Sequence, residues 1–376
     1  MSASRTTGVT AGPRVWFAGG GTGGHLYPGL AIARALKALR PDVEPFFVGA
    51  KRGIERDILP STEFGHVLLD LHPLYRAKVW NNWKTMSSAV GAWRQLRALA
   101  RRARPSAIVG TGGYASGLAL AYAAAHRIPY VLQEQNSYPG LTMRFFSRWA
   151  REVYLGYPEA ERYLEQSNSP TLIDTGNPIE PPPRERPLRA VARRQWGLPA
   201  TGGHVLLVFG GSQGSRAINT AVVDWLRSGA RPPDLYIVWA TGKGTYDEFS
   251  SLAGDGVVIT PYIAPMRDAY AAADLAIARA GAMGTAELCA WGIPAILVPL
   301  PTAAADHQAI NARTLAAVGA AIYIPQIDFT AKRLDQTIRD LLAQPDELAR
   351  LAAGAAARAR PDAALDIAKR IATIMP

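Results

Sequence analysis

The sequence predicts an α/β protein with two domains, each built around a parallel β-sheet. Short β-rich runs alternate with longer helical patterns along the 376-residue chain. Glycine or proline bounds these runs, which is typical of buried strands in βαβ units. The two halves also begin alike, because an apolar strand runs into glycines and then a helix at 15–25 and again at 205–215. This weak internal repeat indicates two Rossmann-like domains.

The expected strands form one group in each half of the chain. In the first half they are residues 14–18, 45–48, 107–109, 130–133 and 152–155. In the second half they are residues 205–209, 235–240, 256–260, 275–278 and 295–298. Between the groups, residues 177–187 read NPIEPPPRERP, which is too rich in proline for a helix or a central strand.

These patterns predict the domain organisation. We expect a flexible tail, a first domain, a proline-rich linker, a second domain and a C-terminal segment, at residues 1–13, 14–178, 179–195, 196–360 and 361–376. Pro361 interrupts the last helical region, and Ile367, Ile371 and Ile374 recur near helical spacing beyond it. The last segment is therefore expected to be an amphipathic helix that packs back on the first domain.

Composition narrows the class of protein and of partner. Hydrophobic residues make up 48% and charged residues 19% of the chain, which is the composition of a globular protein. The net charge of +11 favours anionic partners, among which nucleic acid, anionic lipid and phosphorylated metabolites all fit. The lone Cys289 excludes an intramolecular disulfide. The N-terminus lacks an apolar signal region, and the apolar run at 117–125 is too short to span a bilayer. We therefore expect a cytoplasmic protein that meets a membrane only at its surface.

Four glycine-rich loops follow expected strands, at residues 19–24, 110–117, 210–214 and 280–287. A strand, a glycine turn and a helix N-terminus together form an anion site, because free backbone N–H groups and the helix dipole point at the ligand. Each glycine alone could serve only a tight turn. All four together predict facing anion-binding loops at the strand ends of two domains.

Several other chemistries are disfavoured. The first loop has G-x-G-x-x-G spacing, but the acids Asp42 and Glu44 precede the second strand, so the ribose partner of a dinucleotide site is missing. No P-loop, H-E-x-x-H or D-x-D motif occurs. Gly210-x-Ser212-x-Gly214 matches the nucleophile elbow of α/β-type serine hydrolases, with Asp306 and His307 following in triad order. Adjacent triad partners would be awkward, however, which disfavours this alternative.

The motifs jointly resemble the MurG family, from about residue 14 to residue 326. The resemblance rests on GGGTGGHLYPGLAIA (19–33), GTGGYASG (110–117), QEQNSYPGLT (133–142), TGNP (175–178), GGSQGS (210–215), PYIAPM (261–266), RAGAMGTAEL (279–288) and PLPTAAADHQAINA (299–312). Their order and approximate spacing match the family, so no single motif carries the resemblance alone.

The resemblance implies a GT-B fold, in which the first domain binds a lipid acceptor at the membrane and the second binds a UDP-sugar across a cleft. It implies inverting transfer of N-acetylglucosamine from UDP-GlcNAc to the MurNAc 4-hydroxyl of undecaprenyl-pyrophosphoryl-MurNAc-pentapeptide (lipid I), forming lipid II for peptidoglycan. No cofactor or bound metal is implied, and nucleic acid is not an expected partner. The nearest alternative is a UDP-sugar:diacylglycerol glycosyltransferase, against which the GTGGY and QEQN loops argue.

The expected catalytic residue is His25, directly after the first glycine loop. It stands at the expected N-terminus of a helix. Because imidazole titrates near neutral pH, His25 could act as general base or position the acceptor hydroxyl. The alternative is that His25 only caps its helix.

The resemblance also implies the remaining site residues. On the donor side these are Thr22, Gly23, Gly24, Asn136, Ser212, Gln213, Ile263, Ala282, Met283, Gly284, Thr285, Ala286, Glu287, Gln308 and Asn311. Ile263 would meet uracil through its backbone, Ala282 to Thr285 would hold the α-phosphate, and Glu287 would accept from the ribose hydroxyls. The acceptor wall would comprise Gly113, Tyr114, Glu134 and Gln135. For Asn136 and Asn311 the alternative is loop or helix capping.

Two positions depart from the family pattern. After Gly-Asn-Pro the family usually carries Val-Arg, and that arginine pairs with the donor diphosphate, whereas this chain has Ile179-Glu180. A glutamate would repel phosphate, so we expect Arg184 or Arg186 to take over from the same linker. Gly284 also stands where the family commonly has Ser or Thr, which removes one hydroxyl contact.

A basic, tryptophan-containing segment at 74–104 is the expected membrane contact. Trp80, Trp83 and Trp93 lie there among arginines and lysines, a combination that suits the headgroup layer of an anionic bilayer. The alternative is a helix at 92–103 that packs on the sheet and exposes a basic face.

Overall fold

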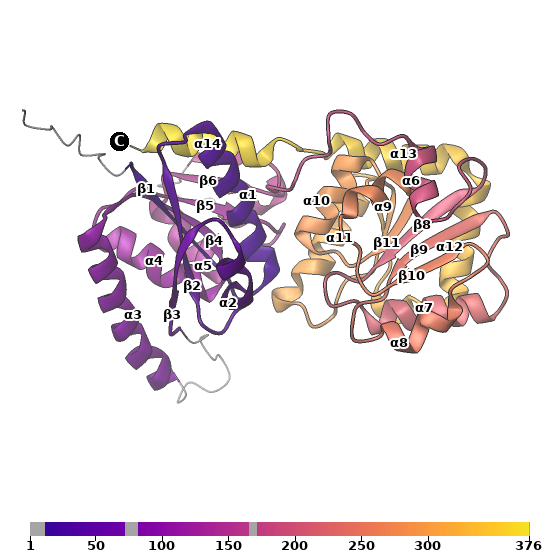
Figure 1. The fold of residues 1–376 in the computed structure, drawn as a ribbon, viewed down its shortest axis with the longest axis horizontal. Helices are drawn as coiled ribbons and strands as arrows, with labels where there is room; N and C mark the ends of the chain where they lie inside the picture. Colours follow the sequence, from indigo (N-terminus) through magenta and orange to yellow (C-terminus); the bar gives the residue numbers. More distant parts are fainter. Residues whose placement is uncertain (1–11, 72–81, 165–170, 376) are drawn as a thin grey trace, which may run out of the picture.

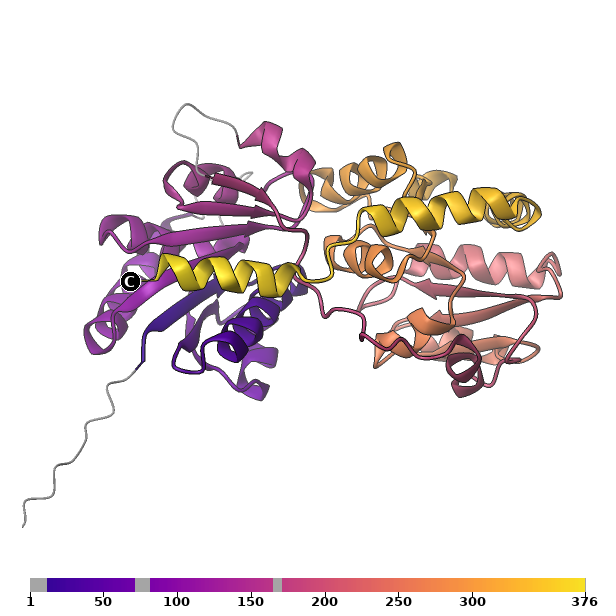
Figure 2. The same ribbon diagram turned by 90° about the horizontal axis from the view of Figure 1, so that it is seen from above.

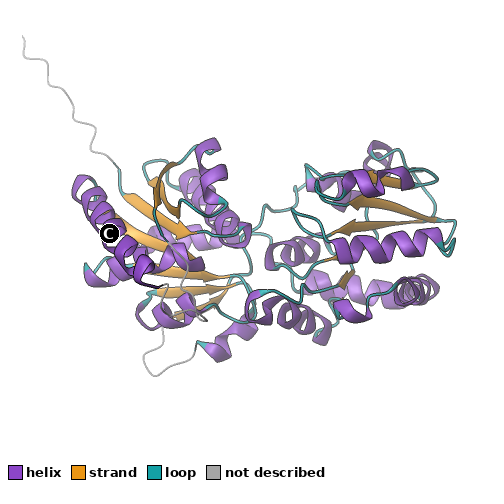
Figure 3. Cartoon of the chain, turned by 90° about the horizontal axis from the view of Figure 1, so that it is seen from below, coloured by secondary structure: helices purple, strands orange, loops and turns teal. Residues whose placement is uncertain are grey.

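The structure, a computed structural model, describes residues 12–71, 82–164 and 171–375. Over these residues the chain forms two domains that lie side by side along the long axis of the molecule (Figure 1). Each domain has helices on both sides of a β-sheet, as Figure 3 shows. The predicted fold class, two Rossmann-like domains with parallel sheets, is confirmed.

The N-terminal sheet has the strand order β3-β2-β1-β4-β5-β6-β7, and its described strands are all parallel. The strands are β1 (Arg14–Gly19), β2 (Glu44–Ala50), β3 (Gly65–Leu69), β4 (Pro105–Gly112), β5 (Tyr130–Glu134), β6 (Glu152–Leu155) and β7 (Thr171–Asp174). The helices among them are α1 (Gly23–Leu39), α2 (Glu55–Ile58), α3 (Asn82–Arg102), α4 (Gly113–Ala125) and α5 (Leu141–Phe146).

The C-terminal sheet repeats this arrangement in the order β10-β9-β8-β11-β12-β13, again parallel. Its strands are β8 (His204–Phe209), β9 (Leu235–Ala240), β10 (Val257–Thr260), β11 (Leu275–Ala278), β12 (Ala295–Leu297) and β13 (Ile322–Tyr323). The helices are α6 (Arg189–Gln195), α7 (Arg216–Arg227), α8 (Tyr246–Phe249), α9 (Met266–Ala272), α10 (Ala282–Trp291), α11 (His307–Ala317), α12 (Ala331–Ala343) and α13 (Pro345–Ala357), followed by α14 (Ala363–Ile374).

The first strand shows why both faces of a sheet are buried. Val15 and Phe17 pack on one face with Leu36 of α1, whereas Trp16 and Ala18 pack on the other face with residues of α3 and α4. Because helices cover both faces, the strand reads as a continuous apolar run instead of an alternating one. The same reasoning explains the apolar run of β8, whose residues divide between two core clusters.

The C-terminal helix α14 belongs to the core of the N-terminal domain. Ile367 and Ile371 are fully buried there beside Val15 and Phe17 of β1. Arg370 also donates to both carboxylate oxygens of Glu152 on β6, at 2.8 and 2.6 Å. Figure 2 shows α13 over one domain and α14 over the other, so the chain crosses between the domains a second time.

The sequence did not predict every element. Strands β3, β7 and β13 are absent from the expected set, and each is a short strand at or near a sheet edge with half-exposed residues. Helix α6 lies inside the segment expected to be linker and packs against α9 of the second domain. The proline-rich connection is therefore shorter than expected at its C-terminal end.

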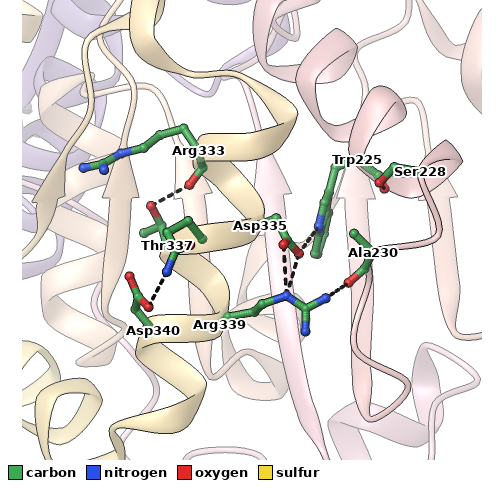
Figure 4. Close-up of polar contacts among 9 residues, drawn as sticks. Trp225, Ser228, Ala230, Arg333, Asp335, Thr337, Arg339 and Asp340 are labelled. Carbon is green, nitrogen blue, oxygen red and sulfur yellow. Dashed lines mark hydrogen bonds and ion pairs between the residues drawn. The ribbon is translucent and has the colours of Figure 1, made fainter.

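Helices α7 and α12 are joined by a polar cluster on the outer face of the C-terminal domain (Figure 4). Trp225 of α7 is fully buried, and its indole N–H donates to Asp335 of α12 at 3.0 Å. Arg339, one turn further along α12, donates to the same carboxylate at 2.9 Å and also reaches the carbonyl of Ala230. These contacts fix α12 against α7 and the turn that follows it.

Candidate active site

The four glycine loops lie at the carboxyl ends of the central strands. In the first sheet, β1 and β4 are neighbours, and their register pairs Gly19 with Gly112. In the second sheet, β8 and β11 are neighbours, and Phe209 pairs with Ala278. Each domain thus ends two adjacent strands in glycine loops at the point where the strand order reverses. This is the position at which open parallel sheets bind their ligands.

His25 occupies the first turn of α1, within reach of the second domain. Thr22 is the N-cap of this helix and makes no side-chain cap bond, so helix capping does not explain His25. The histidine Nδ1 lies 3.1 Å from the Thr22 hydroxyl, and Nε2 has no partner among the described residues. Burial lowers the pKa of His25 from 6.5 to about 4; a hydrogen bond with the Gly20 carbonyl opposes this change, and the charge of His307 adds to it. The imidazole is therefore neutral near pH 7.

The loop after β4 closes around His25. Gly112 and Gly113 have φ values of +100° and +76°, where residues with side chains are strained. A Cβ on Gly112 would lie 2.8 Å from the His25 ring, and one on Gly113 would lie 2.2 Å from the Gly20 carbonyl oxygen. Tyr114, expected on the acceptor wall, packs its ring against Gly21. The two glycine loops of this domain are therefore one assembly around the imidazole.

Glu134 and Gln135 were expected to contact the acceptor, but the structure gives them an inward role. Both are 2% exposed. Glu134 accepts from the backbone N–H groups of Asn136 and Gly140, at 2.9 and 3.0 Å, and burial raises its pKa. The Gln135 amide donates to the carbonyl of Thr111 at 2.8 Å. These two side chains hold the loop after β5 in shape, and their contact with the acceptor stays a prediction.

Ser212 and Gln213 lie on the exposed loop between β8 and α7. A Cβ on Gly214, at φ +76°, would stand 2.1 Å from the Thr241 carbonyl, so glycine lets the loop turn tightly over β9. Ser215 then caps α7 by accepting from the Ile218 N–H at 3.4 Å. No hydrogen bond ties the Ser212 or Gln213 side chain to another described residue, which leaves both free for a ligand.

Helix α10 presents its N-terminus at the carboxyl end of β11. Its first amides, those of Ala282, Met283 and Gly284, have no partner within the helix and can bind an anion. Thr285 was expected to complete this cradle. Its amide instead donates to the Gly281 carbonyl at 3.0 Å, and its hydroxyl lies 2.9 Å from that of Tyr157. The anion cradle is therefore shorter than expected by one residue.

Glu287 and Ile263 offer groups that suit a nucleoside. One Glu287 oxygen accepts from the Tyr270 hydroxyl at 2.6 Å, which leaves the other oxygen for a diol. Burial raises the pKa of Glu287, the bond from Tyr270 opposes this, and the charge of Glu180 adds to it. Ile263 is 2% exposed, but its backbone groups have no hydrogen-bond partner among the described residues. Ala286 lies in the same turn of α10 and is half-buried.

Gln308 and Asn311 of α11, which were expected to bind hydroxyls of the transferred sugar, make different contacts. Gln308 accepts from the Leu300 N–H at 2.9 Å through its carbonyl, so its amide N–H groups remain available. Asn311 is fully buried and bonds to the other domain, where Ser137 and Asn136 lie. Its hydrogen bonds in this structure therefore join the two domains, and its support of sugar binding stays a prediction. Asn136 donates its amide N–H to Glu134 at 3.2 Å and accepts from Asn311 at 3.1 Å.

Other contacts across the domain boundary surround this bond. The Asn177 amide donates to the Gln135 carbonyl at 2.9 Å and to the Ala282 carbonyl at 3.4 Å. Tyr157 of the first domain meets Thr285 of α10. The loops around His25 and the N-terminus of α10 are thus held on facing sides of one boundary, with Thr22, Gly23 and Gly24 on the same turn as His25.

Comparisons with known proteins agree with this geometry. Residues 15–155 match the glycosyltransferase family 28 N-terminal domain, and residues 205–368 match the family 28 C-terminal domain. The UDP-N-acetylglucosamine–N-acetylmuramyl-(pentapeptide) pyrophosphoryl-undecaprenol N-acetylglucosamine transferase of Desulforamulus reducens is 37% identical over 376 residues, covering 96% of this chain and 99% of the relative. The enzyme of the same name from Moorella thermoacetica is 40% identical over 364 residues, with coverages of 93% and 96%. The crystal structure of Acinetobacter baumannii MurG superposes with a TM-score of 0.75 at 28% identity and covers 96% and 99% of the two chains. The chain belongs to the MurG family.

Membership of the MurG family confirms the resemblance read from the motifs and the glycosyltransferase class. It disfavours the hydrolase alternative, and the geometry agrees. His307 Nδ1 contacts the Ala304 carbonyl at 2.7 Å, and among the described residues no hydrogen bond joins Ser212 to Asp306 or His307. A wider likeness to a glycosyltransferase of kitacinnamycin, with a TM-score of 0.71 at 17% identity, reflects the shared fold alone.

The linker corrects one expectation made from the MurG pattern. Arg186 donates to the carbonyls of Ala290 and Trp291, at 2.9 and 3.2 Å, and stacks over the Trp291 ring. These residues end α10, roughly 12 Å from its first amide at 1.5 Å per residue. Arg186 therefore binds the wrong end of the helix to meet the donor phosphates. Arg184 is exposed, and no contact of its side chain with another described residue supports the substitute role.

The expected membrane tryptophans are only partly described. Trp80 and the side chain of Trp83 fall outside the described part of the chain. Trp93 of α3 is half-buried, and its ring packs edge-on to Tyr122 at 5.2 Å and beside His126 at 5.8 Å. Helix α3 thus packs on α4, and the Trp93 ring contributes to that packing.

Sequence reasoning missed an apolar and basic surface, here named the Phe145–Trp149 patch. Leu141, Phe145 and Trp149 are 53%, 55% and 58% exposed, and the two aromatic rings contact edge to face at 5.5 Å. Exposed arginines flank them at positions 127, 148 and 151. Arg127, Arg151 and both rings line one surface hollow. The signal in the sequence was the run RFFSRWAR at 144–151, which alternates aromatic and basic residues.

In the described ranges, no group of three or more His, Cys, Asp or Glu side chains is arranged to hold a metal ion. No helix in those ranges is both long and apolar enough to cross a membrane.

Proposed function

We propose that this chain transfers N-acetylglucosamine from UDP-GlcNAc to the MurNAc 4-hydroxyl of lipid I and so forms lipid II in peptidoglycan synthesis. The observation that carries the proposal is the pairing of two features across the domain boundary. One is the neutral imidazole of His25, and the other is the open N-terminus of α10. The near full-length similarity to transferases with this name supports the substrates.

The second domain supplies the donor site in this proposal. The amides of Ala282, Met283 and Gly284 neutralise charge on the diphosphate, which a departing UDP needs. Glu287 accepts from the ribose diol, and the open backbone of Ile263 pairs with uracil. The free amide of Gln308 donates to hydroxyls of the sugar. Ser212 and Gln213 lie on the loop that reaches the diphosphate from the other side.

The first domain supplies the base. The MurNAc 4-oxygen attacks C1 of N-acetylglucosamine on the face opposite UDP, and the bond from C1 to the β-phosphate oxygen breaks. UDP leaves with the electron pair, and configuration at C1 inverts. His25 Nε2 accepts the proton of the attacking hydroxyl, because Nδ1 faces the Thr22 hydroxyl at 3.1 Å.

A direct assay tests the reaction. UDP release is measured with UDP-GlcNAc and a lipid I analogue, and in parallel with UDP-glucose and diacylglycerol, both in EDTA. Turnover with the first pair alone supports the proposal. Turnover with the second pair alone would instead make the protein a UDP-sugar:diacylglycerol glycosyltransferase. His25→Ala should lower kcat by roughly 10²–10⁴-fold. Near-normal turnover of this variant would remove the catalytic assignment.

Attachment to the cytoplasmic face of the plasma membrane is the second part of the proposal. A lipid-linked acceptor requires the first domain to meet the bilayer. The Phe145–Trp149 patch combines exposed aromatic rings with Arg127, Arg148 and Arg151, which suits an anionic headgroup layer. The sequence also predicts a membrane contact at Trp80 and Trp83.

Vesicle sedimentation tests the membrane contact. Phe145→Ser with Trp149→Ser should weaken binding to vesicles that contain anionic lipid, and added salt should weaken the wild type as well. Ile327→Ser is the matched control, because Ile327 is 86% exposed on the other domain. If the double variant and the control bind the vesicles equally well, the Phe145–Trp149 patch is not the membrane contact. Trp80→Ser with Trp83→Ser then tests the segment expected from the sequence.

A further inference from the structure

Glu55, the first residue of α2, is a fully buried carboxylate. Among the described residues no Lys, Arg or His forms an ion pair with it. Its two oxygens instead accept from backbone N–H groups, one from Ala50 at 2.9 Å and one from Gly21 at 2.8 Å. Burying a charge without a counter-ion is costly. Such a group needs a role beyond packing, and neither the donor nor the acceptor assignments include it.

Three glycines make room for this carboxylate. A Cβ on Gly20 would lie 2.2 Å from a Glu55 oxygen, one on Gly53 2.0 Å from the other oxygen, and one on Gly49 2.7 Å from Cγ. None of the three has the positive φ that requires glycine for conformational reasons. Their lack of a side chain is therefore explained by the space that Glu55 fills. The first glycine loop, the end of β2 and the turn before α2 converge on one side chain.

The Gly21 N–H and the Gly20 carbonyl belong to the same peptide group. Glu55 accepts from the N–H on one side, and the His25 side chain bonds to the carbonyl on the other. Gly113 packs against both, because a Cβ there would lie 2.2 Å from the Gly20 oxygen and 3.2 Å from His25 Nδ1. A single peptide thus connects the buried carboxylate with the imidazole.

We propose that Glu55 is a positioning residue that holds His25 in the tautomer competent as a base. The inference rests on the proposed role of His25. By fixing the peptide, Glu55 points the Gly20 carbonyl at Nδ1, which keeps a proton on Nδ1 and leaves the lone pair on Nε2. The Thr22 hydroxyl, 3.1 Å from Nδ1, is the competitor. Without the carbonyl it donates to Nδ1, the proton moves to Nε2, and the base is lost.

The charges around Glu55 are few. Tyr114 of α4 faces it, and the charge of Glu55 contributes to the raised pKa of that phenol after burial, whereas Arg52 opposes the rise. Arg52 is exposed and lies near Asp70 at 3.7 Å. The Glu55 carboxylate therefore acts mainly on the peptide group between Gly20 and Gly21. By accepting from its N–H it polarises this group and makes the Gly20 carbonyl a stronger acceptor.

Glu55→Gln tests the proposal, because glutamine keeps the shape but replaces one acceptor oxygen by an NH₂ group. That group cannot accept from the Gly21 or the Ala50 N–H. We expect kcat to fall roughly 10–100-fold with little change in the donor KM. In ¹⁵N NMR spectra the His25 ring should shift from the Nδ1–H toward the Nε2–H form. Glu63→Gln, an exposed carboxylate of the same domain that pairs with Arg34, should change neither quantity.

The outcomes separate this inference from the proposed function. If His25→Ala keeps its kcat, the catalytic role of His25 fails whatever Glu55 does. If His25→Ala loses activity but Glu55→Gln retains both kcat and the tautomer, the role of Glu55 alone is overturned. Should Glu55→Gln not fold, the NMR spectrum of the wild type decides. An Nε2–H imidazole at neutral pH contradicts the proposal, and an Nδ1–H imidazole agrees with it.

Discussion

Asn311 in the second domain accepts two hydrogen bonds from Ser137 in the first, one from the backbone N–H at 2.9 Å and one from the hydroxyl at 2.8 Å. Its own amide donates to Asn136 and to the Ala280 carbonyl, at 3.1 and 3.2 Å. All hydrogen-bonding positions of this buried side chain are therefore engaged. Through these bonds Asn311 joins the loop after β5, in the first domain, to the loop after β11, in the second.

Replacing Asn311 should weaken this junction. Asn311→Ala leaves the Ser137 N–H without a partner, and a buried unpaired group costs roughly 1–3 kcal/mol in the free energy of unfolding. Asn311→Asp should cost more, because a carboxylate oxygen would then face the carbonyl of Ala280. Urea unfolding measures both. Arg313→Ala on the exposed face of the same helix is the control and should change stability little. An unchanged Asn311→Asp variant would contradict the arrangement.

The lowered pKa of His25 makes stability depend on pH. In the unfolded chain the imidazole titrates near 6.5, and in the folded chain near 4. Between these pH values the unfolded state binds a proton that the folded state does not. The contribution of His25 to the free energy of unfolding is therefore complete above about pH 6.5 and is lost as the pH falls toward about 4. The difference in unfolding free energy between the wild type and His25→Asn should therefore change across this window. A difference that stays constant with pH would show that the folded imidazole titrates normally.

Much of this architecture could be read from the sequence, because its signals are local. The apolar strands that end in glycine need only neighbouring residues to be recognised, as at 14–18 and 205–209. The position of His25 directly after such a loop is equally local. Short edge strands such as β7 were not predicted, because their half-exposed residues do not form an apolar run in the sequence.

The roles of buried polar residues could not be read in this way. Glu55 reaches Gly21 across 34 positions, and Asn311 reaches Ser137 across 174. Only the fold brings such partners together. The motif resemblance assigned Glu134, Asn136 and Asn311 to ligands, and it gave no sign that they also build and join loops. A side chain near a site and a side chain that shapes the site carry the same sequence signal.

The cluster between α7 and α12 should stabilise the second domain without affecting its chemistry. Hydrogen bonds from Arg339 and then Trp225 lower the pKa of Asp335. Because the folded pKa is depressed, the stabilisation is present above the ordinary carboxyl pKa and is lost as the pH falls through the folded value. Asp335→Asn should therefore lower the Tm at pH 7 and matter less in acid. Calorimetry at both pH values tests this, and a Tm penalty that grows in acid would contradict it.

The charge of Glu180 contributes to the raised pKa of Glu287, after burial and against the Tyr270 hydrogen bond, and Glu287 is the ribose ligand in the proposed donor site. Glu180→Arg should restore the cation usual in the family and lower the donor KM roughly tenfold, the effect of about 1.4 kcal/mol in binding. Glu180→Gln removes the repulsion without adding a cation, so its KM should fall less. Arg186→Ala should leave the donor KM unchanged and lower the Tm, because Arg186 holds the C-terminal end of α10.

These three variants together decide where the diphosphate is held. If Glu180→Arg improves binding more than Glu180→Gln, a cation at position 180 reaches the phosphates, and the wild type relies on the α10 amides without one. If the two variants behave alike, only the repulsion mattered. A raised donor KM in Arg186→Ala would mean that the linker moves toward the donor on binding, since Arg186 contacts carbonyls at the far end of the helix in this structure.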